Sequence, residues 1–296
     1  MTDTIKRRWG DRKDARMVRD GHGLQSIMCH LWPNRTDCEV FWTDTLDATN
    51  LVAYLEKKNA EHPEYKTTVF HAIIVCVARM LYERPYMNRF IQGRRMYDRN
   101  DITLSFVAKR RFQDAADEAL IVLKASGNDT LDSISKQIRG DVGEIRKTEH
   151  ATGGVDRIMD NLAKLPRPVL MLIVKIVRIL DFWGINPDFL TDGDPNYSSV
   201  LLSNLGSIRC SSVYHHLSNY GTNSIIATVG TLHKEEMLME DGHREIRDAV
   251  DLGVTIDERI ADGFYFARCL KLIQYMFEHP ELLDQPLSEP SNFNYE

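Results

Sequence analysis

Residues 254–263 constrain the fold of this chain more than any other stretch of the sequence. An apolar, β-branched run ends at the polar pair Asp257 and Glu258, and a helical pattern begins after Gly263 and stops before Pro280. The stretch therefore predicts a strand, a tight turn crowded with charge, and a helix. Free backbone N–H groups and side chains held by rigid elements meet at such a junction, so we expect a functional site there.

This stretch resembles the chloramphenicol acetyltransferase-like family, which includes the catalytic core of the dihydrolipoyl acyltransferases of 2-oxo acid dehydrogenase complexes. The family carries Asp-His-Arg-x-x-Asp-Gly, then a helix, then Pro-Glu-Leu-Leu. Here residues 257–263 read Asp-Glu-Arg-Ile-Ala-Asp-Gly, and residues 280–283 read Pro-Glu-Leu-Leu. The one difference falls on the family's catalytic histidine, whose position is Glu258. By the same resemblance, Asp262 holds the site together and does not transfer protons.

Two further motifs carry the resemblance, which covers residues 37–283. Residues 200–208 read Val-Leu-Leu-Ser-Asn-Leu-Gly-Ser-Ile, and the family serine at the position of Ser203 stabilises an oxyanion. The apolar helix at 67–84, followed by Pro85 and an asparagine, matches a third family segment. The order and spacing of the motifs are more specific than each motif alone. The resemblance implies a two-layer α/β sandwich, with a mixed β-sheet covered by helices, assembling as a homotrimer with active sites between subunits.

The implied activity is acyl transfer from acyl-coenzyme A to a small-molecule hydroxyl, amine or thiol. In the family, a neutral histidine takes the acceptor's proton, and its pKa near neutrality suits that role. An exposed glutamate titrates near 4, so Glu258 leaves three interpretations open. It is a retuned base, or His215 or His216 supplies the base, or the chain is a catalytically inactive relative that serves in ligand binding or assembly.

Other sequence features limit the partners and the compartment. The 296 residues carry a net charge of −6, which argues against a nucleic-acid partner. Five scattered cysteines without a Cys-x-x-Cys pair indicate reduced thiols in a cytoplasmic protein, and the adjacent histidines have no third ligand at a metal-site spacing. We see no apolar signal region and no lipoyl domain before the core, and therefore expect a stand-alone enzyme without a lipoyl group or metal.

The domain organisation predicted from the sequence has three parts. Residues 1–36 form a basic arm, which is solvated, lies over a neighbouring subunit or grips an anionic ligand; the solvated arm is favoured. Residues 37–285 form the acyltransferase-like catalytic domain, in which 154–196 is a helical insert. Residues 286–296 form a polar tail.

Hydrophobic periodicity predicts the remaining elements. We expect Asp47 and Thr67 to cap two helices, and His71, on the apolar helix, to be structural. An Asp-Gly turn at 241–242 predicts a hairpin. The expected strands are 39–45, 89–97, 102–108, 119–124, 224–230, 236–240 and 245–250, and the expected helices are 48–60, 67–84 and 130–147.

The insert contains an apolar helix at 169–183, interrupted by Lys175 and Arg178. It is shorter than the roughly 20 residues that span a bilayer and its charges are central, so we expect no transmembrane segment. Three interpretations remain: a buried helix, an interfacial helix giving peripheral membrane contact through 168–184, or an apolar lid over an acyl chain. Burial is favoured because it is the usual fate of such a helix.

Overall fold

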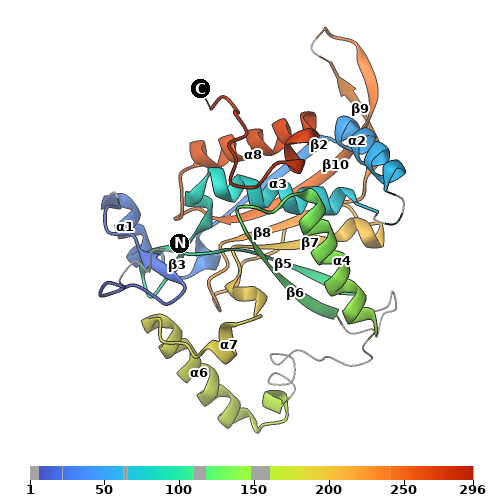
Figure 1. Ribbon diagram of the computed structural model, residues 1–296. Helices are drawn as coiled ribbons and strands as arrows, with labels where there is room; N and C mark the ends of the chain where they lie inside the picture. Colours follow the sequence, from blue (N-terminus) through green and yellow to red (C-terminus); the bar gives the residue numbers. More distant parts are fainter. Residues whose placement is uncertain are drawn as a thin grey trace.

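The protein is a two-layer α/β sandwich built on one mixed sheet (Figure 1). The computed structural model describes residues 7–21, 23–62, 64, 66–109, 118–147, 161–239 and 241–295. The sheet order is β2-β10-β8-β7-β5-β6, with β9 also paired to β10; β7 is parallel to both β5 and β8, and the other pairs are antiparallel. Its strands are β2 (Glu39–Asp47), β5 (Ile102–Lys109), β6 (Glu118–Ala125), β7 (Val200–Asn204), β8 (Ile225–Val229), β9 (His233–Leu238) and β10 (Arg244–Asp257).

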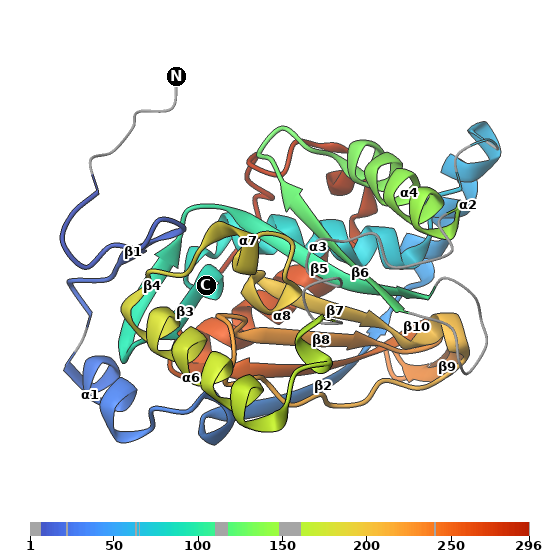
Figure 2. The ribbon, with the colours of Figure 1, turned by 90° about the horizontal axis from the view of Figure 1, so that it is seen from below.

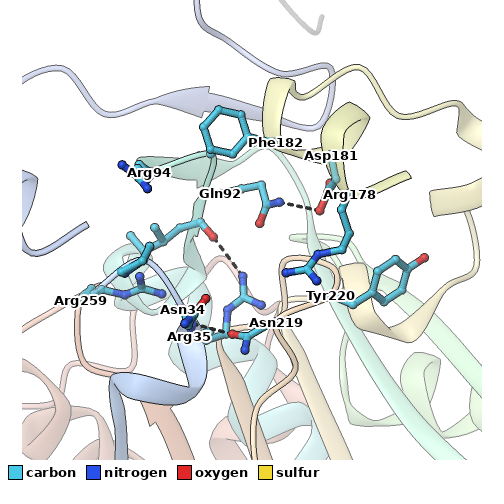
Figure 3. A pocket seen from close by; sticks show the side chains of 13 residues that line it. Asn34, Arg35, Gln92, Arg94, Arg178, Asp181, Phe182, Asn219, Tyr220 and Arg259 are labelled. Atoms are coloured by element: carbon cyan, nitrogen blue, oxygen red, sulfur yellow. Dashed lines mark hydrogen bonds between the residues drawn. The ribbon is translucent and has the colours of Figure 1, made fainter. Parts of the chain in front are cut away.

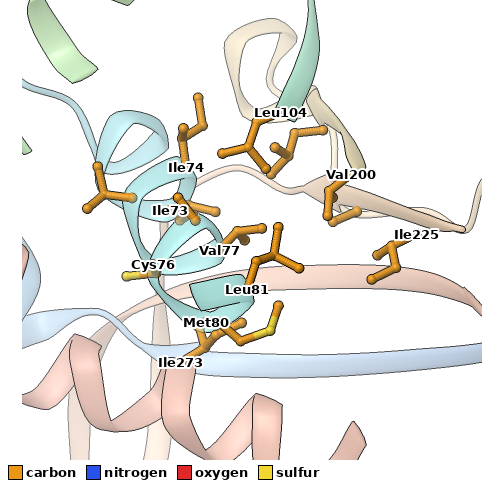
Figure 4. Packing of buried hydrophobic residues seen from close by; sticks show 14 of the residues in the cluster. Ile73, Ile74, Cys76, Val77, Met80, Leu81, Leu104, Val200, Ile225 and Ile273 are labelled. Atoms are coloured by element: carbon orange, nitrogen blue, oxygen red, sulfur yellow. The ribbon is translucent and has the colours of Figure 1, made fainter. Parts of the chain in front are cut away.

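Helices cover one face of this sheet, which confirms the fold predicted from the sequence (Figures 1 and 2). The central helix is α3 (Val69–Glu83), and every residue from His71 to Leu81 is buried. One side of α3 packs on the sheet through Val77 and Leu81, and the other side faces α8, where Ile273 lies (Figure 4). Apolar area removed from water on both sides of this helix stabilises the fold by about 25 cal/mol per Å². The other helices of this layer are α2 (Thr49–Glu61), α4 (Leu131–Lys147) and α8 (Gly263–Glu278).

The expected N-caps, Asp47 and Thr67, each precede the observed N-cap by one residue. Ala48 is the N-cap of α2, and the Asp47 carboxylate accepts from Thr49 N at 2.9 Å. Thr68 caps α3 through a reciprocal capping box with His71, whose ring accepts from Thr68 N. Burial and the nearby Arg139 lower the pKa of His71 to about 4, which fits the structural role expected for it.

The expected strand 89–97 is instead a hairpin of β3 (Arg89–Gln92) and β4 (Arg95–Arg99). Its turn places Gly93 and Arg94 at φ of 57° and 60°, the left-handed region that two-residue hairpin turns require. A Cβ at Gly93 would lie 2.1 Å from Phe182 O, so only glycine fits against the insert here. A single strand was expected because β3 and β4 are short and both contain apolar residues, so the sequence pattern does not mark the turn between them.

The arm pairs with this hairpin through residues 15–17, so the favoured solvated arm is wrong for this part of it. Strand β1 (Ala15–Met17) is antiparallel to β4, and α1 (Gly23–Leu31) follows it. Arg12 is buried, with Nε 2.9 Å from Asp14 Oδ1 and Nη2 3.7 Å from Asp181 Oδ1. Residues 1–6 lie outside the described part of the chain.

The predicted polar tail also packs on the domain. Leu287 is buried, and Ser291 donates from both its N and Oγ to the Glu83 carboxylate, at 2.9 and 2.8 Å. Buried Arg79 donates to the carbonyls of Leu282 and Glu289, each at 2.6 Å. The tail thus supplies a backbone carbonyl to Arg79 and an amide and a hydroxyl to Glu83.

The insert helix α6 (Arg167–Trp183) is exposed, so its expected burial is wrong. Asp181 is its single fully buried residue. Figure 1 shows α6 on the side of the sheet opposite α3 and α8, followed by the short α7 (Asp188–Thr191). In the described residues no helix has the length and apolarity to cross a bilayer. The first residues of the insert, 154–160, lie outside the described part.

Candidate functional site

Buried charges are concentrated at the end of β10. Asp257 has no exposed side-chain surface and receives a two-pronged contact from Arg259, with Nε to Oδ1 at 2.8 Å and Nη2 to Oδ2 at 2.6 Å. Arg35 Nε lies 3.7 Å from Asp257 Oδ2. Planar guanidinium groups match carboxylates in this way, and a buried carboxylate needs such partners. The Asp-x-Arg part of the motif is therefore a structural clamp.

Arg35 ties this clamp to three other segments. Its Nη2 donates to Ile91 O at 3.0 Å and Gly221 O at 3.2 Å, and its Nη1 donates to Ser218 O. The backbone N of Arg35 donates to Asn219 Oδ1 at 2.7 Å. Burial lowers the pKa of Arg35, and the Asp257 carboxylate opposes that shift. The guanidinium thus joins the arm, the β3–β4 hairpin and the 218–221 loop at one point.

A cationic pocket of about 290 Å³ opens beside this clamp (Figure 3). Arg94 and Arg178 reach it and have no ion pair or side-chain hydrogen bond with the residues that the structure describes. One wall is fixed by Gln92, which donates to Asp181 Oδ2 at 2.6 Å. The pocket therefore offers free guanidinium groups beside a rigid wall, an arrangement suited to an anionic group. Its lining residues are Pro33, Asn34, Arg35, Ile91, Gln92, Gly93, Arg94, Arg178, Asp181, Phe182, Asn219, Tyr220 and Arg259.

Glu258 and Asp262 bracket the turn between β10 and α8. Glu258 is exposed, and its backbone N donates to Cys38 O at 2.9 Å. Asp262 is the N-cap of α8, and its Oδ1 accepts from Tyr265 N at 2.8 Å. The Asp-Gly pair thus starts the helix, and its carboxylate satisfies an amide that the helix leaves free. This geometry agrees with a positioning role for Asp262 and leaves the Glu258 carboxylate accessible.

Ser203 lies at the end of β7, held by the rest of its motif. Asn204 Oδ1 accepts from Ser207 N at 3.2 Å and caps a short 3₁₀ helix. Gly206 lies against β8, where a Cβ would be 2.7 Å from Gly230 O. The neighbouring Leu202 is fully buried toward the helices, so Ser203 points to the other face of the sheet. Its hydroxyl has no hydrogen-bond partner in the described part of the chain.

Ser203 and Glu258 lie at opposite ends of the sheet. Ser203 pairs with Thr228 of β8, and Thr228 pairs with Gly253 of β10. Glu258 is five residues beyond Gly253, and a strand rises about 3.4 Å per residue, so the two are separated by roughly 17 Å along the strands. One chain therefore does not bring the candidate oxyanion donor and the candidate base to one carbonyl.

His215 and His216 lie on a segment that crosses the sheet between these two ends. Val213 N donates to Thr228 Oγ1 at 3.1 Å, in the row of Ser203, and Leu217 N donates to the Glu39 carboxylate, next to Asp257 in the register. The two histidine rings are exposed and stacked, with centroids 4.8 Å apart and an interplanar angle of 17°. The structure thus leaves both imidazoles accessible. They lie on the segment between Val213, which is beside the register partner of Ser203, and Leu217, which is beside the register partner of Asp257.

Sequence reasoning missed Arg35, Gln92 and Asn219. Each lies in a different segment, and Arg35 fell in the predicted arm. Neither helical nor strand periodicity marks these positions, because their side chains meet only after the 35–37 turn, β3 and the 218–221 loop assemble. The pairing of Asp257 with Arg259, two residues apart, was the one signal in the sequence that a buried ion pair occupies this strand end.

Comparisons with known proteins identify what this chain is similar to. Residues 190–284 match the family of 2-oxoacid dehydrogenases acyltransferase (catalytic domain), and this range contains the candidate catalytic residues Ser203, His215, His216, Glu258 and Asp262 but not the N-terminal part of the pocket lining. The chain is 23% identical over 260 residues to the lipoamide acyltransferase component of the branched-chain alpha-keto acid dehydrogenase complex of Bacillus subtilis (strain 168). That match covers 86% of this chain and 50% of the relative, so the chain spans about half the length of the curated relative it matches.

Solved structures define the fold. Azotobacter vinelandii dihydrolipoamide acetyltransferase superposes with a TM-score of 0.58 at 14% identity, covering 90% of this chain and 94% of that one. A chloramphenicol acetyltransferase superposes with a TM-score of 0.52 at 13% identity, covering 89% and 99%. The protein therefore has the chloramphenicol acetyltransferase-like fold. Its C-terminal third carries the acyltransferase motifs of the 2-oxoacid dehydrogenase catalytic domain, with glutamate in place of the motif histidine.

Proposed function

We propose that this protein transfers an acyl group from acyl-coenzyme A to a small-molecule hydroxyl, amine or thiol, at sites formed between the subunits of a homotrimer. The observation that carries the proposal is the separation of Ser203 from Glu258. Two motifs with acyltransferase spacing lie at opposite ends of one sheet, so a working site needs the Ser203 end of one copy beside the Glu258 end of another.

The chemistry assigned to these residues is a single displacement. The base takes the proton of the acceptor, the acceptor attacks the thioester carbonyl, and Ser203 donates a hydrogen bond to the resulting oxyanion. Collapse of the tetrahedral intermediate breaks the C–S bond, and the protonated base returns its proton to the leaving thiolate. Asp262 fixes the turn that carries Glu258 and does not take part in proton transfer.

The base is the open assignment within this proposal. In the Azotobacter vinelandii enzyme the catalytic roles of a serine, a histidine and, four positions later, an asparagine were investigated. Glu258 and Asp262 have the same interval here. Glu258 is accessible at the strand end, and His215 and His216 are accessible on the crossing segment, so each is a candidate base.

The pocket beside the clamp supports a substrate with an anionic group. Arg94 and Arg178 are free to contact a phosphate or carboxylate there, as acyl-coenzyme A and many small acceptors carry. Arg35 and Arg259 are already committed to Asp257 and to backbone carbonyls, so they shape the pocket and do not bind the ligand directly.

The second candidate function is a catalytically inactive relative that binds a ligand or assembles with a partner. The specific observation in its favour is Glu258, because the rest of the motif is kept as a clamp and a helix cap while the base position is changed. Buried structural parts of a motif persist without catalysis, since they hold the fold.

A thiol-release assay over a panel of acyl-coenzyme A donors and acceptors separates the two functions. Acyl transfer predicts turnover with at least one pair. No turnover with any donor, together with a ligand-induced rise in melting temperature, supports the inactive relative. Light scattering tests the assembly independently, and a monomer at micromolar concentration contradicts the intersubunit site.

A further inference from the structure

Helix α6 presents a large apolar surface to solvent. Most of its described side chains are exposed, and the helix lies at the end of the molecule remote from α3 and α8 (Figure 1). Ile176 and Ile179 are half exposed, and Trp183 is 65% exposed. Contiguous exposed apolar surface of this kind marks a site of interaction. The exposed apolar residues of this region are Leu165, Val169, Met171, Leu172, Val174, Ile176, Ile179, Phe182, Trp183 and Ile185.

The exposed charges of residues 161–187 are all positive. Lys164, Arg167, Lys175 and Arg178 are exposed, and none makes an ion pair or side-chain hydrogen bond with the residues that the structure describes. Asp181 is the one acidic residue in 161–187, and it is buried against Gln92 and Arg12. The chain as a whole has a net charge of −6, so this cationic stripe runs against the overall composition.

Rigid contacts at its C-terminal end keep α6 in this orientation. Asp181 accepts from Gln92 at 2.6 Å and from Asn186 at 2.5 Å, and Arg12 Nη1 donates to Asp181 O at 3.2 Å. Gly184 ends the helix at φ 69° with Arg12 packed against its Cα. The helix therefore does not rotate its apolar face inward without breaking a buried polar network.

We propose that α6 docks this protein onto an anionic lipid bilayer surface, lying in the plane of the interface. The apolar stripe that ends at Trp183 would enter the boundary between headgroups and acyl chains, and the cationic stripe would contact acidic headgroups. Amphipathic helices with this division of residues bind membranes without crossing them. Each basic residue near an anionic surface contributes attraction that salt weakens.

The positive charge of α6 favours an anionic lipid surface over a second copy of α6 as its binding partner. Two α6 helices packed face to face would bring eight exposed cations of like sign together, and residues 161–187 contain no exposed acid to offset them. An anionic membrane neutralises the same cations. The proposal is independent of acyl transfer, since binding is measured without turnover.

The first experiment is cosedimentation of the full chain with phosphatidylcholine vesicles, with and without phosphatidylserine. We expect binding to the anionic vesicles that falls as NaCl is raised. Arg167→Glu with Lys175→Glu should lower the partition coefficient by at least about 25-fold, since each cation contributes about 1 kcal/mol, or roughly fivefold. The matched control, Lys136→Glu with Lys271→Glu, makes the same charge change on α4 and α8 and should leave binding within about twofold of its value once net charge is matched.

The second experiment removes the apolar part. Ile176→Asn with Ile179→Asn should abolish binding, whereas Leu24→Asn with Ile27→Asn, on the exposed face of α1, should not. Circular dichroism melts establish that each variant is folded. The proposal is overturned if the wild type does not bind anionic vesicles, or if both control pairs lower binding as much as the α6 pairs. It is also overturned if the α6 variants change the oligomeric state by light scattering while the wild type ignores vesicles, which assigns the face to a second copy.

Discussion

Ser203 and Glu258 are separated by the length of five β10 residues, although the motifs that carry them lie on strands separated only by β8. The reason is strand direction. β7 and β10 run antiparallel, so the carboxyl end of one lies at the sheet edge opposite the carboxyl end of the other. Both motifs end a strand, so in a single copy they lie at opposite ends of the sheet.

Mixed assemblies test whether two copies complete the site. Ser203→Ala and Glu258→Gln chains, each inactive alone under the proposal with Glu258 as base, are coexpressed with different tags. A site takes its serine from one copy and its carboxylate from another, so about a quarter of sites, one half times one half, should regain both. Turnover by the mixture well above either parent is the expected result. Mixtures no more active than the parents contradict a shared site.

Ser203→Ala should reduce kcat by about 100- to 1000-fold, because one oxyanion donor is lost. The melting temperature should change little, since the hydroxyl has no partner in the described part of the chain. Ser207→Ala is the matched control in the same motif, because the Ser207 hydroxyl already donates to Asn204 O at 2.8 Å. Equal loss of activity in both variants would indicate damage to the motif and not loss of the donor.

The base is assigned by three variants and a pH profile. If Glu258 is the base, Glu258→Gln abolishes turnover and leaves the trimer intact. If a histidine is the base, the Gln variant stays active and either His215→Ala or His216→Ala does not, and kcat/KM rises with pH over about 6 to 7. Three variants that all match an active wild type would remove this face of the protein from catalysis.

His71 should make the fold sensitive to acid. Its pKa is lowered from 6.5 to about 4, so the unfolded chain binds the proton more tightly than the folded one. The free energy of unfolding should therefore fall as pH drops from 6.5 toward 4, by up to about 3 kcal/mol from this residue. His71→Gln keeps an acceptor for Thr68 N in the capping box and removes the titration. Urea melts at several pH values should show a smaller acid loss in the variant, and an equal loss would exclude His71 as the cause.

At position 181, removing only the negative charge should lower the free energy of unfolding less than removing the hydrogen-bond acceptors as well. Burial raises the pKa of this carboxyl because it penalises the charged form, and Arg12 opposes that shift. Asp181→Ala leaves the buried donors of Gln92 and Asn186 unpaired and should cost about 3–5 kcal/mol in urea denaturation. Asp181→Asn keeps one acceptor and should cost less than half as much. The opposite ranking would mean that the ion pair with Arg12 dominates.

The sequence determined most strands and the covering helices with errors of one or two residues, but β9 begins three residues before its predicted start, and the predicted strand 245–250 is part of one continuous strand, β10, that runs on to Asp257. The apolar helix around Val77 and the strand that ends at Asp257 were correctly predicted, since periodicity and capping residues report local structure directly. The positions of Ser203, Glu258 and Asp262 at strand and helix ends also followed from their motifs. The hairpin at Gly93 was missed, because a turn between two short apolar strands leaves little mark in the periodicity.

Only the tertiary structure decided which of these residues share a site. Strand order and direction place Ser203 and Glu258 far apart, and no local pattern encodes strand order. Burial was likewise a property of the assembly: Arg12 and Arg35, charged residues of the arm, are buried because Asp181 and Asp257 receive them, while the apolar Ile176 is exposed because its helix docks through one end. A side chain's polarity is fixed by the sequence, but its exposure depends on what the rest of the chain brings against it.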